Sequence, residues 1–178
     1  TFQLTGRSVP ESFWAPLREV LKQYDVPLLA LETASGGYRN GRGMWRADTL
    51  PVPVDAVVHY PGGQLGLGFV SDRFYVAEKL TLISTWDGDE LAATRLMWEL
   101  RAARQLPIAQ RADELKRALG QVGEVQGEGL YLTVETLQAE VIARRLLERG
   151  VRVGLGGSGE ERHLRFAPAL NVTSEEIG

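Results

Sequence analysis

The feature that most limits the fold of this chain is a helix that runs directly into an apolar strand and then into a glycine-rich loop. Apolar residues recur at spacings of three and four over residues 11–24, which predicts an amphipathic helix. Residues 26–31 form a short apolar run that is typical of a buried strand. Residues 35–43 include four glycines and cannot form regular structure. This order predicts an α/β unit.

Beyond residue 43 the sequence keeps alternating between strand and helix signals. Pro61 is expected to end the strand before it, and Thr136 to cap the helix after it. The expected strands are residues 55–60, a hairpin of 65–70 with 74–76, the stretch 122–134, and 151–155 with 163–166. The expected helices are residues 89–104, 109–119 and 136–149, with a further helix start at Thr173.

Composition limits the partners and the chemistry that we expect. The formal net charge of −3 argues against a nucleic-acid partner. The chain has no cysteine, which excludes disulfides, thiolate metal sites and cysteine nucleophiles. Only His59 and His163 could supply imidazole ligands, so we expect no metal site. No apolar run approaches the roughly 20 residues of a membrane span, and no signal-peptide pattern opens the sequence. We therefore expect a cytoplasmic protein with no membrane partner.

Several short motifs match one known family in the right order. Residues 29–41 resemble its IADEVQTGFGRTG sequence, and residues 84–88 its STFGGN turn. Residues 123–130 resemble its VRGxGLM strand, residues 164–170 its RFAPPL segment, and residues 173–177 the TxEEI sequence that follows. On these residues the chain resembles the class III aminotransferases, the acetylornithine, ornithine and 4-aminobutyrate type.

The resemblance implies an α/β fold with two parts. Residues 1–105 would be a partial large domain of a fold-type-I aminotransferase that ends in the interdomain helix. Residues 106–178 would be the small α+β C-terminal domain, with the boundary near Leu106-Pro107. The first half of the family's large domain has no counterpart in the sequence. The chain also lacks a starting methionine, so we expect it to be processed or partly represented.

The departures from the family fall on the residues that would hold pyridoxal phosphate (PLP). In the family a lysine that forms a Schiff base lies between the second strand and the glycine loop. The matching position here is His59 or Pro61, and no lysine occurs between Lys22 and Lys79. The aspartate that pairs with the pyridinium nitrogen matches Leu31, and an apolar residue cannot hold the protonated ring.

Two further losses point the same way. The family's phosphate loop and its ring-stacking aromatic belong to the half of the large domain that is not in this sequence. The glutamates of its EPVQGE segment are also missing, because the segment is shortened to something like residues 4–8. We therefore expect no cofactor, and PLP only if another chain or segment completes the site.

The resemblance suggests two candidate site residues, and each also has a plainer interpretation. Thr85 matches a residue that reaches the cofactor phosphate of the neighbouring subunit, but it could simply shape a turn. Arg165 matches an arginine near the substrate carboxylate, a ligand that a guanidinium suits. A structural ion pair is the other interpretation of Arg165. We assign no catalytic residue and no metal-binding residue.

Other polar and glycine residues are expected to be structural. His59, at a strand end, is expected to be a hydrogen-bonded core residue rather than a general base. Glu124 and Glu128 alternate along one predicted strand and are expected to face solvent. The glycines of 36–41 could line an anion site, although a tight turn explains them more simply.

The function that we expect is therefore that of an aminotransferase-like pseudoenzyme without its Schiff-base lysine. It would act as a homodimer, or as a heteromer with an aminotransferase-like chain. Trp86, Met97 and Trp98 suggest association, because aromatic residues and methionine are enriched at interfaces, although core packing also explains them. The alternative is a portion of an active PLP-dependent transaminase that a missing segment or a partner completes. A third hypothesis is a small-molecule binder that uses Arg165 for a carboxylate.

Overall fold

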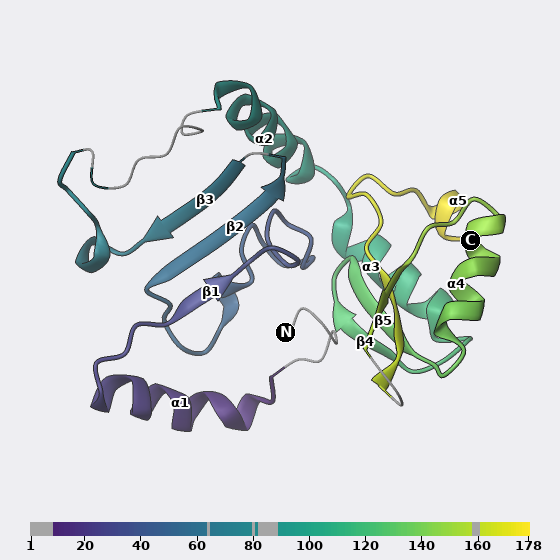
Figure 1. The fold of residues 1–178 in the computed structure, drawn as a ribbon, viewed down its shortest axis with the longest axis horizontal. Coiled ribbons are helices and arrows are strands. Elements are labelled where there is room, and N and C mark those ends of the chain that lie inside the picture. Colours follow the sequence, from purple (N-terminus) through teal and green to yellow (C-terminus); the bar gives the residue numbers. More distant parts are fainter. Residues whose placement is uncertain (1–8, 64, 80, 82–88, 158–160) are drawn as a thin grey trace.

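The computed structural model describes residues 9–63, 65–79, 81, 89–157 and 161–178. These residues form two β-sheets flanked by helices, a mixed α/β architecture (Figure 1). The first sheet has the order β1-β2-β3, with β1 Leu29–Leu31, β2 Ala56–Gly62 and β3 Leu65–Val70. The second has the order β4-β5-β7-β6, with β4 Val125–Glu128, β5 Tyr131–Glu135, β6 Gly154–Gly156 and β7 His163–Phe166.

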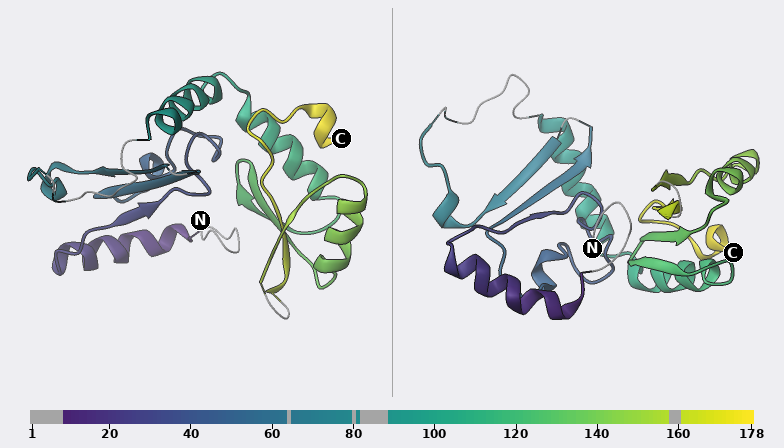
Figure 2. Two further views of the ribbon diagram at one scale, coloured as in Figure 1. Left: turned by 45° about the horizontal axis from the view of Figure 1, so that its top comes forward. Right: turned by 60° about the horizontal axis from the view of Figure 1, so that its bottom comes forward.

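The helices follow the apolar periodicity of the sequence. Described residues form α1 Glu11–Gln23, α2 Glu90–Ala103, α3 Ile108–Leu119, α4 Ala139–Glu148 and α5 Ser174–Ile177, with 3-10 turns η1 Ala47–Thr49 and η2 Asp72–Phe74. The helices predicted over 11–24, 89–104 and 109–119 are confirmed. Figure 2 shows that α2 and α3 connect the part that holds the first sheet to the part that holds the second.

The first sheet combines a parallel and an antiparallel pair. β1 lies parallel to β2, and β3 returns antiparallel to it. The predicted hairpin of 65–70 with 74–76 is wrong, because β3 pairs with β2 and residues 72–74 form η2. Pro61 does not end β2 either. The strand continues to Gly62 through a register shift that begins after His59, and such a bulge accommodates proline.

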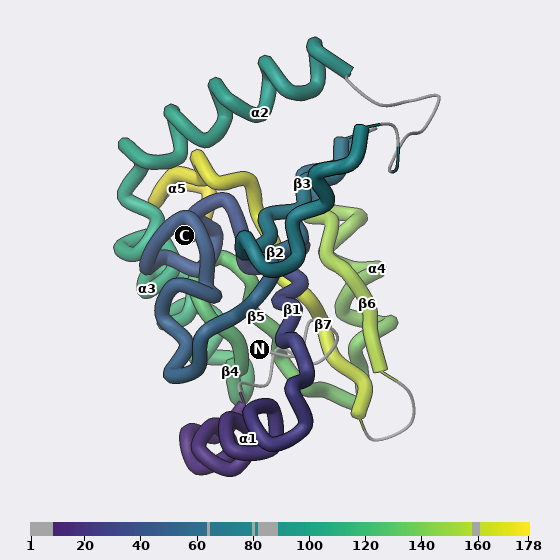
Figure 3. Tube along the Cα trace, turned by 90° about the vertical axis from the view of Figure 1, so that its left-hand side faces the viewer, coloured from purple at the N-terminus to yellow at the C-terminus, as the bar shows by residue number. Residues whose placement is uncertain are grey.

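The prediction that β1 is a buried strand is also wrong. Leu29 and Leu31 are more than half exposed. The segment between β1 and β2 gathers on one side of the first sheet (Figure 3), where it covers Val57 and His59. On the other side, which faces the viewer in Figure 1, no helix or strand of the described residues lies in front of the sheet. An apolar run of this kind normally has both faces covered, and here only one face is.

The second sheet packs against α3 around a small apolar core. The most buried side chains here include Leu130 and Leu132 of the β4–β5 hairpin, which pack with Ile108, Ala112 and Leu115 of α3. The single strand-like stretch predicted over 122–134 is therefore two strands. The hairpin turns at residues 129–130, where Gly129 has a φ of 60°.

Of the two N-terminal caps predicted from the sequence, Thr173 is confirmed and Thr136 is wrong. The Asp89 side chain accepts a hydrogen bond from the Ala92 N–H and caps α2. Thr173 and Glu176 form a capping box at α5. α4 begins after Gln138 rather than after Thr136, because the Thr136 hydroxyl accepts from the Gln138 N–H in the turn before the helix. Among the residues that the structure describes, no helix combines the length and apolar character needed to cross a bilayer.

Candidate functional site

Leu31 is the last residue of β1 and lies on the uncovered side of the first sheet. Its side chain is 59% exposed, and its partner in the parallel register is Val58 of β2. The acid that follows Leu31, Glu32, turns to the opposite side of the sheet and is 2% exposed, so it is not placed to pair with a cationic ring beside Leu31. The structure therefore places an apolar side chain where the resemblance requires a carboxylate.

Both oxygens of the Glu32 carboxylate accept hydrogen bonds from the loop that follows β1. One carboxylate oxygen accepts the Ala47 N–H at 2.6 Å, and the other accepts the Ser35 hydroxyl. A buried carboxylate needs such donors to offset its lost hydration. Glu32 therefore anchors the 33–47 loop beneath the sheet. Sequence reasoning missed this residue, although an acid that follows an apolar strand was a visible signal.

His59 is a hydrogen-bonded core residue, as expected from the sequence. Its ring is 5% exposed, and its Nδ1 lies 2.8 Å from the Glu32 carbonyl oxygen. Because a carbonyl can only accept, Nδ1 carries the proton. The Trp45 ring packs edge-on against the imidazole with centroids 5.1 Å apart. A Cβ at Gly36 would lie 2.7 Å from Nδ1, so the ring has no room beside it for a substrate.

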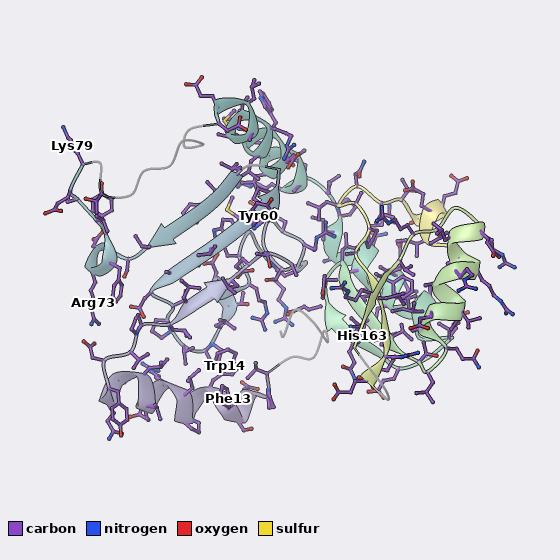
Figure 4. The ribbon with its side chains drawn as sticks, viewed as in Figure 1. Phe13, Trp14, Tyr60, Arg73, Lys79 and His163 are labelled. Carbon is purple, nitrogen blue, oxygen red and sulfur yellow. The ribbon has the colours of Figure 1, made fainter. Side chains whose placement is uncertain are left out.

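The lysines lie away from the end of β2, where the resemblance places the Schiff-base residue. The chain has three lysines, Lys22, Lys79 and Lys116, and they lie on α1, after η2 and on α3. Figure 4 shows Lys79 at the opposite end of the first sheet from Tyr60. The residues at this position, with Leu31 and Pro61 in place of an acid and an amine, do not fit PLP.

Arg39 joins the two sheets. Its guanidinium donates to the carbonyl oxygens of Leu130 at 3.2 Å and Pro168 at 2.7 Å. Its own carbonyl oxygen accepts the Leu130 N–H at 2.8 Å. Burial lowers the pKa of the guanidinium, which still stays protonated near neutral pH. Sequence reasoning did not single out Arg39, because its partners are carbonyl groups far along the chain.

Glu128 does not face solvent, which corrects the expectation from strand alternation. Its side chain is 16% exposed, and its two carboxylate oxygens lie 2.6 Å from Arg42 Nε and 2.7 Å from Arg46 Nε. Glu124, by contrast, is exposed as expected. These charges and Lys116 line a cavity of about 460 Å³ between the 40–46 loop, α3 and β4. The ion pairs hold the loop against the second sheet.

The remaining predicted residues are not gathered into one site. Arg165, on β7, donates to the Leu155 carbonyl oxygen at 3.2 Å, which supports the strand pairing. Thr85 and Trp86 lie outside the described residues. Met97 and Trp98 are exposed on α2, and the Arg101 guanidinium stacks over the Trp98 ring at 5.0 Å. Among described residues, no cluster of His, Asp and Glu side chains could hold a metal ion.

The 36–41 loop is a set of tight turns, as its glycines suggested. Gly37, Tyr38 and Gly41 have φ values of 64°, 71° and 76°. Asn40 is buried and ties the loop together. Its side-chain amide donates to the Ser35 and Gly43 carbonyl oxygens, and its side-chain oxygen accepts from the N–H groups of residues 42 and 43.

Comparisons with known proteins show the resemblance that the motifs indicated. No protein-family model matches the chain. The mitochondrial ornithine aminotransferase of Arabidopsis thaliana is 26% identical over an alignment of 195 positions, which covers 94% of this chain and 40% of that protein. The chain thus spans about two fifths of the length of this curated relative.

Solved structures give the same answer for the fold. The lysine aminotransferase of M. tuberculosis in the internal aldimine form matches with a TM-score of 0.80 and 24% identity, covering 94% of this chain and 42% of that one. The N-acetylornithine aminotransferase of Stenotrophomonas maltophilia matches with a TM-score of 0.75 and 22% identity, covering 95% and 48%. A transaminase from Virgibacillus matches with a TM-score of 0.81 and 22% identity, covering 94% and 46%.

Proposed function

Because the chain has a class III aminotransferase-like, fold-type-I structure over less than half of the length of such enzymes, we propose that it is an aminotransferase-like protein that does not catalyse transamination. The observation that supports this proposal is the identity of the residues at the ends of β1 and β2. Leu31 projects into the open where a ring-pairing acid would stand. At the end of β2 lie the enclosed ring of His59 and Pro61. Neither residue can form a Schiff base.

The protein would act through association, with itself or with an aminotransferase-like chain. The exposed face of α2 supports this proposal. Leu91 and Trp98 stand seven residues apart on one side of the helix, and Trp98 is 60% exposed, so core packing does not account for it. Large exposed aromatic side chains of this kind are enriched at protein interfaces. The net charge of −3 supports a protein partner rather than a nucleic-acid partner.

A spectral titration with PLP tests the proposal. The purified chain is titrated with PLP, and the absorbance of a lysine-bound adduct is followed before and after dialysis. The lysine aminotransferase of M. tuberculosis, which has been solved in its internal aldimine form, serves as the positive control. We expect no band that survives dialysis of this chain. A saturable band at one equivalent of PLP would contradict the proposal.

The alternative is that the chain is a portion of an active PLP-dependent transaminase completed by a missing segment or a partner chain. The observation that favours it is the uncovered face of the first sheet, together with the free edge of β1. Co-expression with an aminotransferase-like chain distinguishes the two functions. If the alternative holds, the complex transaminates more than the partner does alone. If our proposal holds, this chain adds no turnover to its partner.

A further inference from the structure

Among the described residues, the strand side chains on the uncovered face of the first sheet are all uncharged. The register places on it Leu29 and Leu31 of β1, Ala56 and Val58 of β2, and Val70 of β3, and the alternation of β2 adds Tyr60. We call this set the open face. Four of these side chains, Leu29, Leu31, Tyr60 and Val70, are about half exposed. A patch of this kind marks an interaction surface.

The open face has a ridge on one side and a furrow on the other. Leu29 and Leu31 stand along the β1 edge and form the ridge. β3 puts Gly68 opposite Val58 on the same face, with Gly66 two residues away. A Cβ at either glycine would meet nothing within 4 Å, so the surface above this part of β3 is empty, whereas Val70 projects at the end of the strand. Glycine in a strand is typical of a place where another chain approaches the backbone closely.

From this shape we propose that the open face is a self-association surface, on which a second copy of the chain stacks its own open face. A two-fold axis parallel to β2 would lay β1 of one copy over β3 of the other. Leu31 of each copy would then fill the furrow at Gly68 of its partner, and Leu29 would pack on the partner's Val70. This is the isologous pairing that closed dimers use. Stacked sheets lie about 10 Å apart, and leucine side chains over glycines fill that gap.

The lack of charged side chains on the open face also favours a second copy of the chain as its partner. An uncharged face is complementary to itself, because stacking two copies brings no like charges together. The charged side chains of Arg73 and Asp25 pair with each other within one copy, through a hydrogen bond from Nη2 of Arg73 to Oδ2 of Asp25, so they need no partner from the second copy. This inference rests on the association proposed above. It names a surface distinct from the α2 face of Leu91 and Trp98.

Light scattering coupled to size exclusion tests the proposal. We expect the mass of two chains for the wild type and of one chain for Leu31→Glu. Because Leu31 is exposed within one copy, the helical circular dichroism of the variant should be unchanged. Val70→Glu, on the other side of the face, is the second variant and should also give one chain. Leu147→Glu, at an exposed position on α4 outside both surfaces, is the matched control and should remain a dimer.

Cross-linking tests the orientation, and the absence of cysteine gives it a clean background. Leu31→Cys protein is mixed with Gly68→Cys protein and treated with a short bismaleimide. The mixture should cross-link several-fold more than Leu31→Cys alone, because the two-fold axis separates the two copies of residue 31. A wild-type monomer at every concentration, or a dimer that only Leu91→Glu dissociates, would overturn the proposal. These outcomes do not depend on whether PLP reacts with the chain.

Discussion

The guanidinium of Arg39 donates to the carbonyl oxygen of Pro168 at 2.7 Å, across 129 residues of sequence. The same group donates to the Leu130 carbonyl oxygen. One side chain from the loop after β1 thus satisfies two acceptors of the C-terminal part. The association of the two sheets within one chain depends on polar contacts of this kind as well as on apolar packing.

Removing this contact should loosen the junction between the sheets. Arg39→Ala leaves two carbonyl oxygens without their donor, and such a loss costs about 1–3 kcal/mol for a buried group. We expect the free energy of unfolding in urea to fall by about 2 kcal/mol. Arg145→Ala is the matched control, since its side chain is exposed on α4. A loss no larger than that of the control would contradict this role of Arg39.

Glu32 should be the most important acid for the loop beneath the first sheet. Glu32→Ala removes the acceptors of the Ala47 N–H and the Ser35 hydroxyl from a buried position. Hydrogen bonds to a charged group contribute about 1.5–3 kcal/mol each, so we expect a drop in Tm well beyond that of the exposed control Glu124→Ala. Thermal unfolding followed by tryptophan fluorescence measures both. Equal Tm values for the two variants would show that Glu32 anchors nothing.

Gly129 should tolerate no side chain, for two separable reasons. Its φ is 60°, and a Cβ there would run into the Arg39 carbonyl oxygen. Gly150 has a φ of 82°, and a Cβ there would meet nothing within 4 Å, so it isolates the backbone strain. We expect Gly150→Ala to cost about 1 kcal/mol, the penalty of the left-handed conformation, and Gly129→Ala clearly more. Urea unfolding checks both, and equal costs would mean that no clash occurs.

The docking of α5 on α3 should weaken in acid. Hydrogen bonds from Ser174, Gln110 and Arg111 lower the pKa of Glu114 to about 2. A lowered folded-state pKa adds stability above the unfolded-state pKa near 4.5, and that stability is lost as the pH falls toward 2. The protection of the α5 amides against hydrogen exchange, measured relative to their intrinsic exchange rates, should therefore fall between pH 4.5 and pH 2.

Glu114→Gln is the variant that tests this pH dependence. The amide cannot titrate, so the protection of the α5 amides should already be low near neutral pH and should change less in acid. Hydrogen bonds from Thr173 also lower the pKa of Glu176, so some acid sensitivity should remain in this variant. If the protection of the α5 amides of the wild type stays constant throughout the acid range, Glu114 does not hold the helix.

Local signals were enough to predict the helices and the cap of α5. Thr173 stands beside the amide that it caps, so the sequence itself contains the interaction. The errors fell on contacts between distant residues. Glu128 was expected in solvent because its partner Arg46 lies 82 residues away. β3 was paired with the wrong segment, because alternation predicts a strand but not its neighbour.

At the candidate site, the sequence predicted which of the family's cofactor-binding residues are missing. The sequence identified Leu31 and the missing lysine, because a motif match specifies residue types at positions. It could not show that Leu31 is exposed or that His59 is enclosed by Trp45 and Gly36. Those facts depend on which face of the sheet the 33–54 segment covers, and alternation alone does not choose a face.

Intact-mass spectrometry after PLP and borohydride tests the central claim most directly, because reduction fixes any Schiff base onto its lysine. The wild type is compared with Lys22→Arg, Lys79→Arg and Lys116→Arg under one equivalent of PLP. We predict only trace adduct, spread over the three lysines and reduced only in part by each substitution. A stoichiometric adduct that a single substitution abolishes would contradict the claim that the chain has lost its cofactor site.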